Sequence, residues 1–137
     1  MAEIILKGHK VAKGKAAGEA IVSHAPMSFM SAVDSETGIV IEKNHPLEGI
    51  SIAGKILVFP MEKGSTGGSG GLFELASHKK HPVGIINLRA DPIITVGAII
   101  SDIPMVDRLD ANPLEVIKTG DFVEIDADQG TVKVSKK

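Results

Sequence analysis

A run of small residues, 63–71, lies between a continuous apolar stretch and the start of a helical pattern. The apolar stretch, residues 55–59, is typical of a strand that is covered on both faces, and the helical pattern begins at Leu72. Glycine-rich loops lose much conformational entropy on folding and bury little surface, so chains usually keep them short. A strand, such a loop and a helix in succession indicate an α/β fold, in which ligands bind beyond the carboxyl ends of the parallel strands.

The other segments predict a mixed sheet around this unit. β-type runs separated by turn residues indicate further strands at 3–6, 19–22, 38–42, 83–88 and 103–106. Asp91-Pro92 is typical of an N-cap followed by proline, so a helix is expected over 93–100. A one-turn helix ending at residue 117 and a hairpin of 121–126 with 131–134 complete the pattern. We therefore predict a single α/β domain over residues 1–137, with a sheet that is parallel at its centre.

The composition excludes several classes of function. The formal charge of −2 gives no basic surplus for binding nucleic acid or an anionic membrane, and four Phe with no Trp or Tyr leave few rings for stacking bases. Without cysteine, the chain has no disulfide, thiolate nucleophile or thiolate-held metal cluster of its own. No apolar stretch approaches the roughly 18–20 residues of a membrane span. The first ten residues lack a signal-peptide core, so a cytoplasmic protein is expected.

The spacing of the loop glycines fits neither common nucleotide-binding motif. A P-loop needs the order Gly-Lys-Ser/Thr, which does not occur here, and a dinucleotide fingerprint needs glycines at i, i+2 and i+5. What remains is a set of backbone N–H groups at a helix start, with the hydroxyls of Ser65, Thr66 and Ser69, which suits an anion. Ser69 is also a candidate cap for a helix over 72–78. A flexible glycine-rich turn without a ligand stays open as an alternative.

No cluster in the sequence forms a complete catalytic set or metal site. His78 and His81 have the i, i+3 spacing of a ligand pair. They follow a helix, however, where the helix dipole favours cationic side chains. The sequence therefore predicts no metal site on this chain, and a partner is expected to supply the rest of any active site.

Motifs spread along nearly the whole chain occur together and in order. They are PMSF at 26–29, VD at 33–34, TG at 37–38, HPL at 45–47, GKIL at 54–57, KGST at 63–66, ADPII at 90–94, GAII at 97–100, IPMVD at 103–107 and TGD at 119–121. With this combination the chain resembles the small, swivel component of the aconitase X family. One departure is Ser31-Ala32, where the resemblance leads us to expect a Gly-Gly pair.

The resemblance implies a swivelling β/β/α domain that forms a heterodimer with a large aconitase X-type subunit. That subunit is expected to hold an iron–sulfur cluster of the [4Fe-4S] type, and the pair to act as a hydro-lyase on a small carboxylate or phosphate substrate. Ser65 is expected to be the catalytic base that removes a proton next to a carboxylate, while the cluster iron helps the hydroxyl leave. The residues expected to bind substrate around it are Lys63, Gly64, Thr66, Gly67, Gly68 and Ser69.

The family has two substrate branches, and the resemblance favours one of them. The first branch dehydrates (R)-5-phosphomevalonate to trans-anhydromevalonate 5-phosphate in isoprenoid-precursor biosynthesis; the second dehydrates cis-3-hydroxy-L-proline. Residues 90–107 and the Lys-Gly-Ser-Thr form of the loop are more similar to the first branch. A non-catalytic ligand-binding or scaffold module stays open as an alternative of another class. A phosphohistidine swivel domain is disfavoured, because no histidine follows a Thr/Ser pair in the loop.

Overall fold

The computed structural model describes residues 2–63 and 67–137. Its strands, in chain order, are β1 (Glu3–Lys7), β2 (His9–Ala12), β3 (Lys15–Val22), β4 (Ile56–Val58), β5 (Gly84–Ile86), β6 (Met105–Asp107), β7 (Phe122–Asp126) and β8 (Thr131–Ser135). Its helices are α1 (Gly68–Ser77), α2 (Pro92–Ile100) and α3 (Pro113–Val116). Within these described ranges, no helix is both long and apolar enough to cross a membrane.

The described strands form one mixed sheet in the order β1-β8-β7-β3-β4-β5-β6-β2. Its centre, from β3 to β6, is parallel, and the remaining pairs are antiparallel. The connections from β4 to β5 and from β5 to β6 contain α1 and α2, as crossovers between parallel strands require. The predicted fold class, α/β with a parallel centre, is confirmed.

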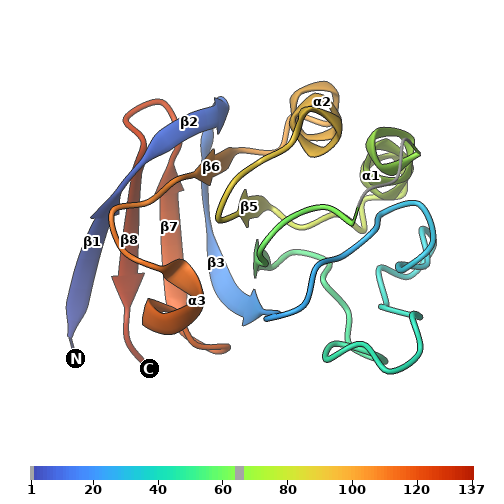
Figure 1. The fold of residues 1–137 in the computed structure, drawn as a ribbon, viewed down its shortest axis with the longest axis horizontal. Helices are drawn as coiled ribbons and strands as arrows, with labels where there is room; N and C mark the ends of the chain where they lie inside the picture. Colours follow the sequence, from blue (N-terminus) through green and yellow to red (C-terminus); the bar gives the residue numbers. More distant parts are fainter. Residues whose placement is uncertain (1, 64–66) are drawn as a thin grey trace.

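The sheet folds over itself into two layers (Figure 1). Residues 15–19 of β3 pair with β7, whereas residues 20–22 pair with β4, so this strand belongs to both layers. On the other side, only Gly8 separates β1 from β2, which pair with β8 and β6 at opposite ends of the strand order. The outer layer is β1, β8, β7 and the first half of β3, and the inner layer is the second half of β3 with β4, β5, β6 and β2. Helices α1 and α2 cover the open face of the inner layer, which gives the expected β/β/α arrangement.

The central strands of the inner layer, β4, β5 and β6, are buried on both faces. Leu57 and Phe59 belong to the core between this layer and the helices, whereas Ile56 and Val58 belong to the core between the two layers. Successive side chains of a strand point to opposite faces, so a strand that separates two cores must be apolar at every position. The continuous apolar run from Ile56 to Phe59 has this cause, whereas Lys55 before it is partly exposed and pairs with Glu19.

Residues 38–42 do not form the predicted strand. Ile39 and Val40 make isolated bridges to two different segments, at Ser51 and Val33 respectively. Neither bridge is continued by the neighbouring residues, so no ladder forms. The apolar pattern arises instead because alternate residues pack into the helix-side core, where Val40 is completely buried.

Candidate functional site

The glycine-rich segment lies at the carboxyl edge of the parallel strands, as predicted. After β4 the chain runs through Glu62 and Lys63 to the start of α1. Asn87 follows β5, Asp107 ends β6, and Asp91 caps α2 by accepting a hydrogen bond from the N–H of Ile94 at 2.8 Å. Polar side chains therefore follow each of these parallel strands at the edge where α/β folds bind ligands.

Lys63 is the first residue of the glycine-rich segment, and its ammonium group forms an ion pair with Glu42. Its Nζ lies 2.9 Å from Oε2 of Glu42, and its backbone N–H donates to the carbonyl oxygen of Met27 at 2.8 Å. The side chain stays about half exposed, so this ion pair leaves the ammonium accessible to an anionic ligand. The next three residues, Gly64, Ser65 and Thr66, lie outside the described residues. The role predicted for Ser65 therefore stays a prediction.

Three of the four glycines that follow are explained by close packing. A side chain at Gly68 would lie 2.7 Å from Oε1 of Glu62, and one at Gly67 would lie 2.6 Å from the sulfur of Met30. A side chain at Gly71 would overlap the carbonyl oxygen of Phe29. The glycines thus let the start of α1 approach Glu62 and the segment around Phe29 more closely than any other residue type would allow.

Ser69 does not cap α1, so that part of the sequence interpretation was wrong. The N-cap is Gly67, and Ser69 lies inside the helix. Its hydroxyl donates to the carbonyl oxygen of Ile93 at 2.6 Å. Ile93 is in the first turn of α2, so the hydrogen bond joins the starts of the two helices. The structural role of Ser69 is to connect α1 with α2.

Glu62 is the residue at this site that the sequence interpretation missed. Its side chain is only 4% exposed, and neither carboxylate oxygen has a hydrogen-bond partner among the described residues. Burial raises the pKa of this carboxyl to about 7, the nearby Phe29 N–H acts in the opposite direction, and the charge of Asp91 raises it further. A buried acid with unused oxygens and a pKa near neutrality is typical of a functional group. The available signal was a glutamate between a buried strand and a glycine-rich helix start.

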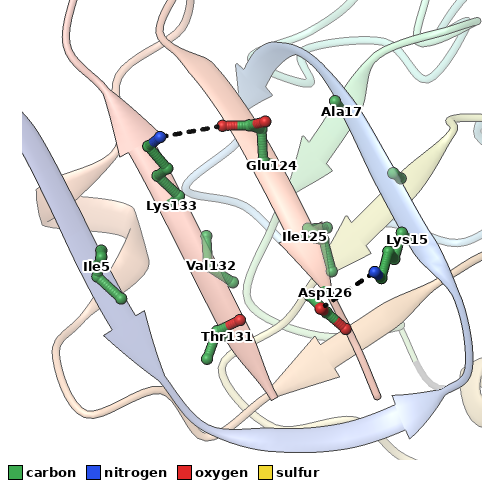
Figure 2. Close-up of a pocket in the computed structure, with 10 residues that line it drawn as sticks. Ile5, Lys15, Ala17, Glu124, Ile125, Asp126, Thr131, Val132 and Lys133 are labelled. Carbon is green, nitrogen blue, oxygen red and sulfur yellow. Dashed lines mark ion pairs between the residues drawn. The ribbon is translucent and has the colours of Figure 1, made fainter. Parts of the chain in front are cut away.

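A hollow lies on the solvent face of the outer layer, away from this edge (Figure 2). Glu124 and Lys133 are paired at 3.8 Å between β7 and β8, and Lys15 and Asp126 at 3.8 Å between β3 and β7. These charges alternate in sign and are mostly exposed, so each pair contributes little to stability and none favours one type of ion. The hollow has the character of a solvated sheet face.

A metal site on this chain would need several clustered His, Asp or Glu side chains. Among the residues that the structure describes, no group of three or more His, Asp or Glu side chains is arranged to hold a metal ion. The whole sequence contains no cysteine. The described side chains of this chain therefore do not fit an iron–sulfur cluster.

Comparison with known proteins identifies the family. A model of the aconitase X swivel domain matches residues 5–134. The phosphomevalonate dehydratase small subunit of Methanosarcina acetivorans is 48% identical over 136 residues, which cover 99% of this chain and 94% of the relative. The corresponding subunit of Thermococcus kodakarensis is 53% identical over 129 residues, which cover 94% of this chain and 95% of the relative.

Solved structures agree with the sequence matches. The crystal structure of Thermococcus kodakaraensis aconitase X in its holo-form is 50% identical, with a TM-score of 0.92 over 97% of this chain and 99% of that chain. The solution NMR structure of a UPF0107 protein is 41% identical, with a TM-score of 0.90 over 97% of this chain and 100% of that chain. The chain has the same fold as these proteins over 97% of its length, and it belongs to the aconitase X swivel-domain family.

Proposed function

We propose that this chain is the small subunit of a two-subunit hydro-lyase that dehydrates (R)-5-phosphomevalonate to trans-anhydromevalonate 5-phosphate. The observation that carries the proposal is the identity of 48% with a phosphomevalonate dehydratase small subunit over 99% of this chain. The matched residues include both layers of the sheet and helices α1 and α2. The match therefore includes the segment that would form the active site. The expected product is an unsaturated phosphate ester for isoprenoid-precursor synthesis.

The proposal assigns the iron–sulfur cluster to a large partner subunit. This chain has no cysteine for such a cluster, and the family resemblance implies a cluster of the [4Fe-4S] type on the partner. When bound there, the cluster would supply a Lewis acid for the leaving hydroxyl. This chain would contribute the groups that bind and deprotonate the substrate, and closure of the two subunits would exclude water from them.

Ser65 is the proposed base, with Lys63 and the start of α1 as the groups that favour a negative charge beside it. Helix α1 has ten residues and no acidic residue in its first turn, so its own side chains do not neutralise its positive end. Lys63 adds an accessible ammonium group at the same place. These charges would attract a substrate carboxylate or phosphate and would stabilise an alkoxide far better than water does. Gly64, Thr66, Gly67, Gly68 and Ser69 are the proposed neighbours of the bound substrate, with Ser69 facing it through its backbone because its hydroxyl donates to the Ile93 carbonyl oxygen.

The experiment is an assay of the chain with and without its large subunit. The purified pair should release water from (R)-5-phosphomevalonate, and this chain alone should not, because it lacks the cluster. Turnover by the isolated chain would contradict the need for a partner. Turnover of cis-3-hydroxy-L-proline in place of phosphomevalonate would transfer the enzyme to the other substrate branch. A cluster-loaded pair that dehydrates neither compound would favour a non-catalytic ligand-binding module.

A further inference from the structure

The only two arginines of the sequence, Arg89 and Arg108, lie together at the carboxyl edge of the parallel strands. Arg89 follows β5 and Arg108 follows β6, and these two strands are neighbours in the sheet. The N–H of Arg108 donates to the carbonyl oxygen of Leu88 at 3.1 Å. The N–H of Ala90 donates to Oδ2 of Asp107 at 2.8 Å. These two hydrogen bonds bracket the arginines and hold their backbones side by side.

The loop that contains Arg89 also contacts the segment that runs from β4 to the glycine-rich loop. On one side of the arginine, the N–H of Leu88 donates to the carbonyl oxygen of Pro60 at 3.1 Å. On the other side is Asp91. Burial raises the pKa of the Glu62 carboxyl most, and the charge of Asp91 adds to that effect, so Asp91 lies near Glu62. The arginines therefore belong to the same edge of the sheet as the candidate site.

Neither guanidinium group has a strong partner among the described residues. Arg89 is exposed, and its side chain forms no ion pair or hydrogen bond with any of them. Arg108 is half exposed, and its one ion-pair partner there, Asp107, is 3.8 Å from Nε. Arg108 also has a φ of +51°, a conformation that is uncommon for residues other than glycine and that recurs at ligand sites. Both side chains are thus available to bind an anion.

We infer that Arg89 and Arg108 bind the phosphate group of the substrate. The inference rests on the proposed function and adds a phosphate subsite to it. In (R)-5-phosphomevalonate the carboxylate is next to the carbon that loses a proton, and the phosphate is at the opposite end of the molecule. Lys63 follows β4, whereas the two arginines follow the next two strands, each about 4.8 Å further along the sheet. The substrate then lies along this edge, with its carboxylate towards Lys63 and its phosphate at the arginines.

The chemistry of the two groups matches. An arginine side chain stays charged at every physiological pH and donates two parallel hydrogen bonds to phosphate oxygens. A phosphate monoester carries a charge of about −1.5 to −2 at pH 7, which two guanidinium groups neutralise. The substrate of the other family branch, cis-3-hydroxy-L-proline, has no phosphate for them to bind. Arg89 and Arg108 are therefore the residues of this chain that select between the two substrates.

The test replaces both arginines by glutamine in the assembled, cluster-loaded enzyme. The KM for (R)-5-phosphomevalonate should rise by about 10–100-fold, because charge-assisted hydrogen bonds to the phosphate are lost, and kcat should change much less. Replacing both by lysine should give an intermediate KM, because lysine keeps the charge and loses the paired geometry. The matched control is Lys133→Gln, which removes an exposed positive charge from the outer layer (Figure 2) and should leave KM unchanged.

Two inhibitors distinguish the phosphate from the rest of the substrate. Inorganic phosphate should compete with the substrate in the unaltered enzyme, and its inhibition constant should rise by about tenfold or more in the double glutamine variant. (R)-Mevalonate has the carboxylate and lacks the phosphate, so it should inhibit both enzymes equally. Weaker inhibition by (R)-mevalonate in the variant, to the same degree as by phosphate, would overturn the assignment of the arginines to the phosphate.

The remaining outcomes separate the inference from the proposed function. Unchanged KM in the double glutamine variant of an active enzyme would overturn the inference and leave the proposed function intact. Loss of binding to the large subunit in that variant, measured by size-exclusion chromatography, would also overturn it, because the arginines would then be interface residues. An unaltered pair without dehydratase activity would overturn both.

Discussion

The carboxyl group of Glu62 has a pKa of about 7 in the folded chain, against a usual value of 4.5, chiefly because it is buried. Between these two values the folded chain holds a proton that the unfolded chain has released. The stabilisation associated with that proton is complete below about pH 4.5 and is lost as the pH rises through 7. The difference between the two pKa values corresponds to about 3 kcal/mol in the free energy of unfolding.

Glu62→Gln should abolish this loss. Relative to the unaltered chain, the variant should gain about 3 kcal/mol in free energy of unfolding between pH 5 and pH 8, because glutamine stays neutral throughout. Urea unfolding of both chains at pH 5, 6, 7 and 8 measures the difference. Ionisable groups that are present in both chains, including Asp91 beside Glu62, make nearly equal contributions to the two unfolding free energies, so their effects largely cancel in the difference. A difference that does not change with pH would contradict the raised pKa.

Ser65 and Ser69 should respond differently to replacement by alanine. Ser65→Ala removes the proposed base, so activity of the assembled enzyme should fall by about 10²–10⁴-fold with little change in folding. Ser69→Ala leaves the Ile93 carbonyl oxygen without its donor, and should cost about 1–2 kcal/mol of stability with a small effect on kcat. Activity and urea unfolding of each variant, with cluster content measured in parallel, check both. Near-normal activity in Ser65→Ala with collapse in Ser69→Ala would show that the base was assigned to the wrong serine.

The sequence predicted the position of the glycine-rich segment better than the contacts that its residues make. Composition and position both placed a ligand loop after β4, and the structure has the segment at that edge. The task of Ser69 depends on the Ile93 carbonyl, which is distant in sequence and is brought near only by helix packing. Glu62 was missed because its position between a buried strand and a glycine-rich helix start does not by itself show that the side chain is buried. Its burial depends on Gly68 and on the segment around Phe29, which close over it.

At the level of the elements, α1 begins at Gly68, four residues before the predicted start at Leu72. The helical pattern of apolar residues begins only at Leu72, and glycines are poor helix formers, so propensity placed the boundary too late. The helix includes these glycines because they allow close packing against Phe29 and Glu62. Tertiary contacts therefore override local preference in the first turn.

Two glycines in this turn provide a matched comparison. Gly71→Ala should destabilise the protein by about 1–3 kcal/mol, because the new methyl group would overlap the Phe29 carbonyl oxygen and force the backbone apart. Gly70→Ala should stabilise it by about 0.5–1 kcal/mol, because an added side chain there meets no atom within 4 Å and alanine favours a helix. Thermal unfolding of the two variants checks the opposite signs. Equal effects would refute the close-packing explanation.

The central strands were predictable and some outer elements were not. Apolar runs at β4 and β5 reflect burial on both faces, which leaves a strong signal in sequence. The short β2, with its two exposed residues His9 and Lys10, leaves almost none. Residues 38–42 have a strand-like pattern, yet their backbone groups find separate partners in the folded chain. A hydrophobic pattern indicates which residues of a segment are buried. Whether the segment joins a ladder depends on the distant segments with which its backbone pairs.

At the level of the whole molecule, the two layers are joined where the β7–β8 turn meets the β1–β2 junction. The N–H of Gly8 donates to the carbonyl oxygen of Gly130 at 2.8 Å. A side chain at Gly130 would lie 2.5 Å from the Gly8 carbonyl oxygen, and Gly130 has a φ of +69°. No other residue type fits this contact without strain. The contact fixes the position at which the chain passes from β1 in the outer layer to β2 in the inner layer.

Gly130→Ala should therefore cost more stability than a glycine replacement at an uncrowded turn. Gly49 has a φ of +83° and no atom within 4 Å of an added side chain, so Gly49→Ala should cost only the left-handed strain, about 1–2 kcal/mol. Gly130→Ala should lose about 1–3 kcal/mol more from the collision with Gly8. Urea unfolding of both variants measures the gap. Equal losses would mean that the junction between the layers adapts freely.

The pairing of the first strand with the last also has a consequence for synthesis. Glu3 pairs with Ser135 and Lys15 with Asp126, so neither β1 nor the first half of β3 has its partner until residues 122–135 have left the ribosome. At about 5–20 residues per second, that delay is on the order of ten seconds, and non-local sheets then need milliseconds to seconds to fold. During this time β1 is an open edge able to pair with other nascent chains. The charges of Glu3 and Lys7, at the two ends of its short apolar stretch, are the kind of residue that discourages such pairing.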